Sequence, residues 1–153
     1  METPGAETGG GIRVRSRSWT LWHPWGVTTV EARLGRRRVG VAHVSQAYRG
    51  ELGLTSWWIV GLRVGAAHRR QGIGRRLVAA CLAAVEERGA PTLHAAVRAE
   101  NARSVALFES CGFERVADPS LQEAVARVHK PLFRPPPQLF VFARLTDAAP
   151  PKE

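Results

Sequence analysis

A nine-residue segment near the middle of the chain, HRRQGIGRR at residues 68–76, combines four arginines with two glycines in the spacing Gly-x-Gly. An apolar run, WWIVGLRV, precedes it, and a helical pattern begins at Ile73. Gly72 and Gly74 leave their backbone N–H groups uncovered by side chains, and a helix N-terminus carries partial positive charge. Such a junction can hold an anion, above all a pyrophosphate. The alternative is a solvated basic helix start with a turn glycine.

Two other phosphate-binding motifs do not fit this segment. A Walker loop, G-x-x-x-x-G-K-[ST], needs a lysine, and the segment has none. The dinucleotide fingerprint, G-x-G-x-x-G, needs a glycine where this chain has Leu77. An anion site at residues 68–76 would therefore be of a different type.

The hydrophobic pattern around the segment predicts the elements that position it. β-Branched or alternating residues predict strands at 11–19, 27–34, 39–48, 92–97, 113–117 and 138–145, and the apolar run predicts a buried central strand at 57–64. A 3.6-residue period predicts helices at 73–85 and 102–111 and a third that opens at Asp118-Pro119. Strands interspersed with helices indicate an α/β (α+β) fold with helices packed on one central sheet.

The composition indicates one soluble domain. The chain has 153 residues, of which 44% are hydrophobic and 23% charged, enough for one sizeable core. It has neither an apolar run of about 20 residues nor a signal-peptide pattern, so we expect no membrane contact and a cytoplasmic location. We expect a disordered lead-in at 1–11, one domain at 12–146 and a flexible tail at 147–153. Cys81 and Cys111 are expected to be reduced thiols, and no metal site is expected.

The chain is strongly basic, with a formal net charge of +9. All of the basic residues except Lys130 and Lys152 are arginines. A basic surface suits anionic partners, so nucleic acid or ribosome contact is one prediction, on the arginine clusters at 13–17, 36–38, 69–76 and 127–134. The alternative is a codon bias toward arginine, and no RNA-binding motif interleaves aromatic residues with these arginines.

Two blocks of the sequence resemble conserved blocks of the GNAT N-acetyltransferase superfamily. LRVGAAHRRQGIGRRLV at 62–78 resembles the acetyl-CoA motif R/Q-x-x-G-x-G/A after a central strand. VRAENARSVALFESCGFE at 97–114 resembles the second block, in which an asparagine opens a helix that closes with Gly-Phe. Within this superfamily, the sequence is most similar to the ribosomal-protein alanine N-acetyltransferases.

The resemblance implies a fold and a reaction. The fold is a GNAT-like central mixed, mostly antiparallel twisted sheet flanked by helices. Its N-terminal helical region is shortened, because only SWTLWHPWG separates the first two strands where the family has one or two helices. The reaction moves an acetyl group from acetyl-CoA, the co-substrate, to an amine of a protein N-terminus, peptide or small molecule, by direct attack on the thioester. A homodimer is also considered.

The resemblance also assigns roles to individual residues in the co-substrate site. It implies that the end of the central strand pairs with pantetheine, through Leu62, Arg63 and Val64. It implies that the pyrophosphate is surrounded by the N–H groups of Arg70, Gln71, Gly72, Ile73, Gly74 and Arg75. Asn101 would hydrogen-bond near the pantetheine arm, and Phe108 would complete the site. The other interpretation of Asn101 is a helix N-cap.

The sequence departs from the family at two catalytic positions. Ala96 stands where the ribosomal-protein group has a glutamate base, and Phe108 stands where a tyrosine acid is common. His94, on the same side of its strand as Ala96, is a candidate base, and so is Glu51. His94 as an ordinary hydrogen-bonded strand residue is the alternative. Catalysis by proximity alone, a weak or inactive acyl-CoA-binding module, and a basic RNA- or ribosome-associated protein remain as further hypotheses.

Overall fold

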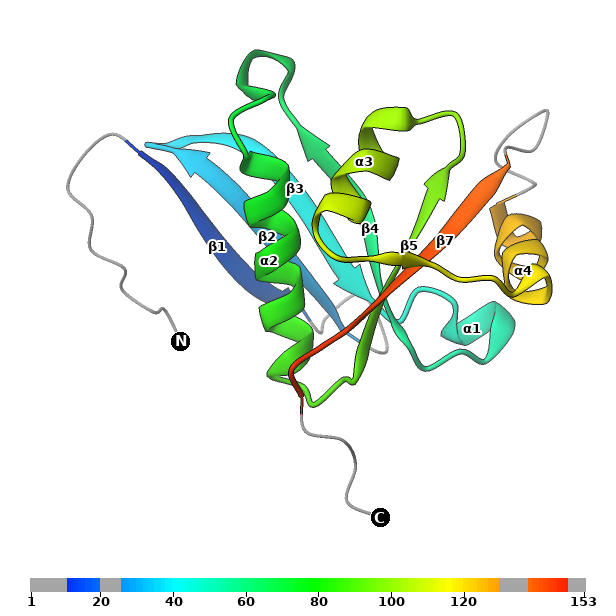
Figure 1. The fold of residues 1–153 in the computed structure, drawn as a ribbon. Helices are drawn as coiled ribbons and strands as arrows, with labels where there is room; N and C mark the ends of the chain where they lie inside the picture. The colour runs from blue at the N-terminus through cyan, green and yellow to red at the C-terminus, as the bar shows by residue number, and fades with distance from the viewer. Residues whose placement is uncertain (1–10, 20–25, 130–137, 149–153) are drawn as a thin grey trace.

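The computed structural model describes residues 11–19, 26–129 and 138–148. In these residues seven strands form one sheet in the order β1-β2-β3-β4-β5-β7-β6 (Figure 1). The strands are β1 (Ile12–Trp19), β2 (Val27–Leu34), β3 (Arg37–Ser45), β4 (Trp57–Val64), β5 (Thr92–Arg98), β6 (Glu114–Arg115) and β7 (Leu139–Leu145). The helices are α1 (Arg49–Leu52), the 3-10 turn η1 (Ala66–His68), α2 (Ile73–Glu86), α3 (Ala102–Ser110) and α4 (Pro119–His129).

The sheet confirms the predicted fold class. Every pair of neighbouring strands is antiparallel except β4 and β5, which run parallel, so the sheet is mixed and mostly antiparallel. β1 ends at Trp19 and β2 begins at Val27, so the connection between them comprises residues 20–26. Residues 20–25 of that connection, with two of its tryptophans, lie outside the described residues, as do 130–137.

Helix α2 packs on one face of the sheet because its apolar residues repeat with the helical period. Its buried positions are Ile73, Leu77, Val78, Cys81, Leu82, Ala84 and Val85. They meet the buried side chains of β2 and β3, such as Val30 and Val44, in the larger core cluster. A fully buried side chain of this size contributes about 1.5–3 kcal/mol to stability. Figure 1 shows α2 crossing in front of β1, β2 and β3.

A second, smaller cluster lies on the other side of β4, β5 and β7. Its buried members are Tyr48, Trp58, Val125, Leu139 and Val141, contributed by the chain before α1, by β4, by α4 and by β7. Alternation along β5 explains the division, because Leu93, Ala95 and Val97 belong to the larger cluster while Ala96 packs against the smaller one. The sheet therefore separates two apolar layers.

Two short elements were not predicted from the sequence. α1 has four residues and is capped at its C-terminus by Gly53, whose φ is +64°, and η1 has three residues. Neither is long enough to show a hydrophobic period. β6 is also shorter than the predicted strand at 113–117, since it covers only Glu114–Arg115. Of the helices described, none has the length and apolar character that crossing a bilayer requires.

Candidate functional site

The parallel strands β4 and β5 pair at one end and diverge at the other. Their pairing runs from Trp57↔Leu93 to Ile59↔Ala95. Beyond that point β4 continues to pair with β3, as far as Gly40↔Val64, and β5 continues to pair with β7. Figure 1 shows the two strands separating toward the top of the view. Among the described residues, no strand pairs with this edge of β4 after Ile59.

A β-bulge lies where β4 leaves β5. Val60 pairs with His43 and Arg63 pairs with Val41, so Gly61 and Leu62 together face one residue of β3. Gly61 has φ +67°, a conformation that glycine adopts readily. Bulges bend a strand and re-aim its side chains, and they are common beside active sites. This bulge was not predicted from the sequence, although a glycine inside an apolar strand run is its usual signal.

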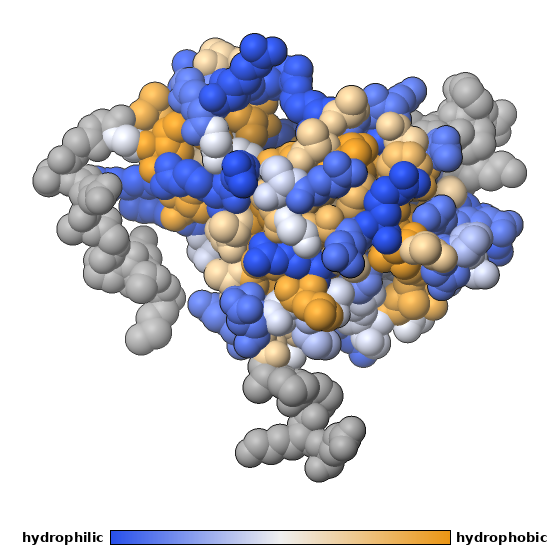
Figure 2. Space-filling view, viewed as in Figure 1, coloured by the Kyte–Doolittle hydropathy of each residue, from blue (hydrophilic) through white to orange (hydrophobic). Residues whose placement is uncertain are grey.

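A cleft of about 670 Å³ opens beside the divergent end of β4. Its lining residues are Leu62, Arg63, Val64, Gly65, Ala66, His68, Arg69, Arg70, Gly72, Ile73, Gly74, Arg75, Asn101, Arg103, Ser104 and Leu107. Five of them are arginines and none is acidic. Figure 2 shows a strongly hydrophilic surface over the loop between β4 and α2, at the top of the view. The charge of the cleft is suited to an anion.

The N-terminus of α2 supplies backbone donors to this cleft. Gly72 is its N-cap in the left-handed conformation, with φ 74° and ψ 11°. Arg70, with φ 63°, is the one non-glycine residue of positive φ among those described. The first helical hydrogen bond runs from the Arg76 N–H to the Gly72 carbonyl at 3.2 Å. The N–H groups of the first turn before Arg76 have no helical acceptor and can bind an anion.

Gly74 has a packing role in addition to its exposed N–H group. A Cβ at this position would lie 3.2 Å from Leu107 Cδ2 of α3. The missing side chain therefore lets the start of α2 approach α3 closely. The Arg75 guanidinium adds a second link, because it donates to the Ser110 carbonyl at 3.3 Å. Together these contacts fix the two helices that border the cleft.

Asn101 lies at the start of α3, at the border of the cleft. It is the N-cap of α3, where its Oδ1 accepts the Ser104 N–H at 3.2 Å, and it also lines the cleft. Arg103, Ser104 and Leu107 line the cleft as well and were missed by the sequence analysis. The sequence feature that could have predicted them is their position in the first turns of the helix that begins after Asn101.

Two residues assigned to the co-substrate site do not line the cleft. Gln71 is exposed beside it. Phe108 is only 4% exposed and packs against Phe113, at 5.2 Å between ring centroids, and Phe142, at 6.2 Å. Phe108 is therefore a core residue in this structure, where its side chain holds α3 against the sheet.

His94 lies at the paired end of β4 and β5, outside the cleft lining. Its ring stacks on Trp58 with centroids 4.8 Å apart, and its Nδ1 is buried without a hydrogen-bond partner among the described atoms. Burial lowers the pKa of His94, and the Trp57 backbone offsets part of that effect. A neutral imidazole at pH 7 can accept a proton. Ala96, two residues further along β5, packs against the smaller cluster.

Glu51 is exposed on α1 and also lies outside the cleft lining. Burial, with a smaller contribution from the Glu51 carboxylate, raises the pKa of Tyr48 to about 12. The Tyr48 hydroxyl hydrogen-bonds His129 Nε2 at 2.8 Å, and its ring meets Trp58 edge-on at 4.5 Å. Neither Tyr48 nor His129 was predicted from the sequence to have a role, because the two partners are distant in the chain.

The cysteines do not add a nucleophile to the site. Cys81 and Cys111 are both free thiols, and burial raises the pKa of Cys81 to about 12. A thiol with so high a pKa stays protonated at neutral pH and is a poor nucleophile. In the described part of the chain there is also no cluster of His, Cys, Asp and Glu that could hold a metal ion.

Comparison with known sequences supports the assignment of the two blocks. The family model described as "Acetyltransferase (GNAT) family" matches residues 9–113. The [ribosomal protein bS18]-alanine N-acetyltransferase of Escherichia coli is 30% identical over 95 residues, which are 59% of this chain and 64% of that relative. The chain thus spans somewhat less than two thirds of the relative's length. An Arabidopsis thaliana probable N-acetyltransferase, HLS1-like, is 42% identical over 65 residues, 42% of this chain and 16% of that relative.

Solved structures share the fold. The ribosomal-protein-S18-alanine N-acetyltransferase of Escherichia coli matches with a TM-score of 0.58 and 21% identity, over 82% of this chain and 72% of that one. A Bacillus anthracis protein provisionally described as a streptothricin acetyltransferase, solved in complex with acetyl coenzyme A, matches with a TM-score of 0.63 and 19% identity, over 82% of this chain and 66% of that one.

Proposed function

Because this chain belongs to the GNAT acetyltransferase family, we propose that it is an enzyme that transfers the acetyl group of acetyl-CoA to the nitrogen of an amine. The observation that carries the proposal is the cleft where β4 leaves β5. It brings a strand edge without a partner, the first turn of α2 and five arginines to one place. A strand edge can pair with an extended ligand segment that carries amide groups. The first turn of α2 and the arginines can bind the phosphates of the same ligand.

The residues present fit acetyl-CoA as the co-substrate. The N–H groups of the first turn of α2 after Gly72 would hold the pyrophosphate, assisted by Arg70 and Arg75. The β4 backbone from Leu62 to Val64 would pair with the amides of pantetheine. The side-chain oxygen of Asn101 is used in the N-cap of α3. Its side-chain amide nitrogen would donate a hydrogen bond to the pantetheine arm.

The reaction forms one bond and breaks one. The neutral amine attacks the thioester carbonyl carbon, the C–N bond forms, and the C–S bond breaks. The amine nitrogen loses a proton and the sulfur of the leaving CoA gains one. Because the bulge at Gly61 lies two residues after Ile59, the last β4 residue that pairs with β5, we expect the acetyl group to sit near this point. His94 is the proposed proton acceptor, through water, since it lies on β5 outside the cleft lining.

We propose the N-terminus of a protein as the first acceptor to test. The support is the similarity to the Escherichia coli relative, which is a [ribosomal protein bS18]-alanine N-acetyltransferase. A peptide with an N-terminal alanine is therefore the natural probe, with small primary amines as comparison acceptors. Membership of the GNAT family favours an enzyme over the acyl-CoA-binding module and the RNA- or ribosome-associated protein considered from the sequence.

Calorimetry with acetyl-CoA and an assay for free CoA thiol test the two halves of the proposal. At a concentration 100 times its Kd, acetyl-CoA should stabilise the protein by about 2.7 kcal/mol and raise its Tm. Thiol release should then depend on an added amine. If millimolar acetyl-CoA produced no binding heat and no increase in Tm, the co-substrate assignment would be refuted. Tight binding without thiol release with any amine would identify a binding module instead.

A further inference from the structure

The edge of the sheet formed by β1, β2 and the start of β3 carries a row of arginines on the face opposite α2. Arg13 pairs with Arg33, Arg15 with Glu31 and Arg17 with Thr29, so these side chains share one face. Residues of the opposite parity, such as Val14 and Val30, contact the core cluster that includes α2. We call this outer surface the arginine face; it comprises Arg13, Arg15, Arg17, Arg33, Arg36 and Arg38.

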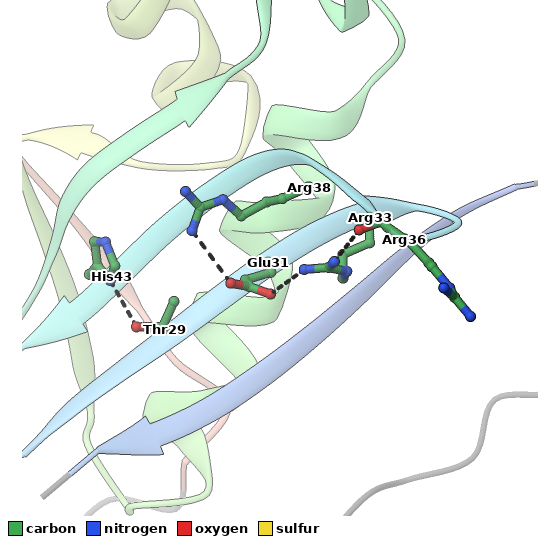
Figure 3. Close-up of polar contacts among 6 residues, drawn as sticks. All are labelled: Thr29, Glu31, Arg33, Arg36, Arg38 and His43. Atoms are coloured by element: carbon green, nitrogen blue, oxygen red, sulfur yellow. Dashed lines mark hydrogen bonds and ion pairs between the residues drawn. The ribbon is translucent and has the colours of Figure 1, made fainter.

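Charge is unusually one-sided in this part of the molecule. Between Gly11 and Gly50 the sequence has eight arginines, and Glu31 is its only acidic residue. Glu31 contacts Arg33 at 3.2 Å and Arg38 at 3.5 Å, and its side chain is only 19% exposed (Figure 3). Among the described residues, the six arginines of the arginine face outnumber the one carboxylate that lies on it. A bias toward arginine in the whole chain does not explain the depletion of acids here.

The arginine face is a shallow concavity, separate from the cleft. A hollow of about 630 Å³ is lined by Gly11, Arg13, Arg15, Arg17, Glu31, Arg33, Gly35 and Arg36, none of which lines the cleft. Alternate residues of a strand are about 6.7 Å apart, so the three β1 arginines present a regular row of charges. Figure 3 shows the β2 and β3 side chains of this face projecting from the side of the sheet turned away from α2.

We propose that the arginine face binds the phosphate backbone of single-stranded RNA, a second function beside the proposed transferase activity. Guanidinium groups bind phosphate oxygens through paired hydrogen bonds, and a row of them matches a ligand with repeated negative charges. Open sheet faces are the surfaces on which several RNA-binding modules hold single strands. His43, which hydrogen-bonds Thr29 at 2.9 Å, carries the only aromatic ring among the described side chains of this face, so binding should be largely independent of base sequence.

Fluorescence anisotropy with a labelled oligouridylate of about 12 nucleotides tests this proposal, with millimolar CoA present to occupy the cleft. Between about 50 and 300 mM salt, the affinity of the unaltered protein should fall with a log–log slope of about −0.7 for each phosphate contact. The triple variant Arg13→Gln/Arg15→Gln/Arg17→Gln should bind at least about tenfold more weakly, with a slope smaller by about 2.

The matched control removes three arginines elsewhere. Arg49→Gln/Arg115→Gln/Arg127→Gln changes the net charge by the same amount on α1, β6 and α4. It should keep RNA affinity within about twofold. An equal loss in both triple variants would overturn the proposal, since it would show that only net charge matters. Equal affinity for a DNA duplex, or tighter binding of polyglutamate, would also overturn it.

Glu31→Gln tests the same surface in the opposite direction and guards against a folding defect in the triple variant. Removing the carboxylate raises the charge of the face and releases Arg33 and Arg38, so RNA binding should become about threefold tighter. Unchanged or weaker binding in a folded variant would contradict the proposal. Acetyl-CoA binding should be unaltered in all these proteins, so the test does not depend on the outcome for the cleft.

Discussion

The two ends of the β4–β5 junction contrast in the chemistry that they bring together. At the paired end, Trp58 stacks on His94 at 4.8 Å and meets Tyr48 edge-on at 4.5 Å. At the divergent end, the strand edge after the Gly61 bulge borders a cleft lined by five arginines. The paired end is held by buried aromatic rings, which anchor the two strands. At the divergent end, the backbone groups of β4 that do not pair with β5 can therefore pair with a ligand.

The contrast also separates binding from proton transfer. The groups suited to hold an anion lie at the divergent end, whereas the candidate base His94 lies at the paired end. Ala96 and Phe108 stand at the two positions where the resemblance to the family implies a base and an acid, and neither side chain is titratable. In the proposed reaction, the amine proton would therefore pass from the cleft to the paired end or leave through solvent.

The largest expected effect comes from Gly72→Val at the divergent end. A β-branched residue does not tolerate φ 74°, so the loop should rotate and withdraw the N–H groups of α2 from the cleft. We expect acetyl-CoA affinity to fall by about a hundredfold in calorimetry, a loss of about 2.7 kcal/mol.

Gly89→Val is the matched control for this substitution. Gly89 follows the other end of α2, has φ +70°, and like Gly72 has open space at its Cβ. Both variants should lose about 1–2 kcal/mol of stability, but Gly89→Val should bind acetyl-CoA normally. A similar loss of affinity in both would mean that strain in α2, rather than the cleft backbone, controls binding.

The next largest effect is expected from His94→Ala at the paired end. If His94 accepts the amine proton, turnover should fall at least about tenfold while acetyl-CoA affinity stays the same. Added imidazole should restore part of the rate in the variant, which a purely structural role of the stacked ring would not allow. Unchanged turnover would remove His94 from the mechanism and favour solvent as the acceptor.

The sequence was sufficient to predict most elements because their signals are local. The period of α2 and the apolar run of β4 located both elements to within about a residue, and the glycine spacing located the start of the cleft. Asn101 was correctly considered as an N-cap, since capping depends on neighbours within one turn.

The remaining features depend on contacts between distant segments. The bulge at Gly61 exists only in the register with β3, and the close approach at Gly74 exists only because Leu107 of α3 packs there. The stack of His94 on Trp58 requires the parallel pairing of β4 with β5. The arginine face likewise follows from the register of three strands, which hydrophobic patterns do not specify.

A smaller effect is expected from Tyr48→Phe, which removes the hydroxyl that links the chain before α1 to the end of α4. Losing the 2.8 Å bond to His129 should cost about 1 kcal/mol in denaturant unfolding. The double variant with His129→Gln should show coupling of similar size. Acetyl-CoA affinity should not change, because both residues lie away from the cleft. Weaker binding would mean that the two ends of the junction are not independent.

The smallest effect is a difference between two pH profiles of stability. Burial lowers the pKa of His94 and of His129, to which the Arg98 charge adds, from an ordinary value of 6.5. Between those lowered pKa values and 6.5 the unfolded chain binds more protons than the folded one. Stability is therefore complete above about pH 6.5 and is lost as pH falls through that window. His94→Gln removes the contribution of one of these two histidines, so the Tm of the variant should decline less between pH 7 and about pH 5. An unchanged decline would show that His94 is no more buried in solution than in the unfolded chain.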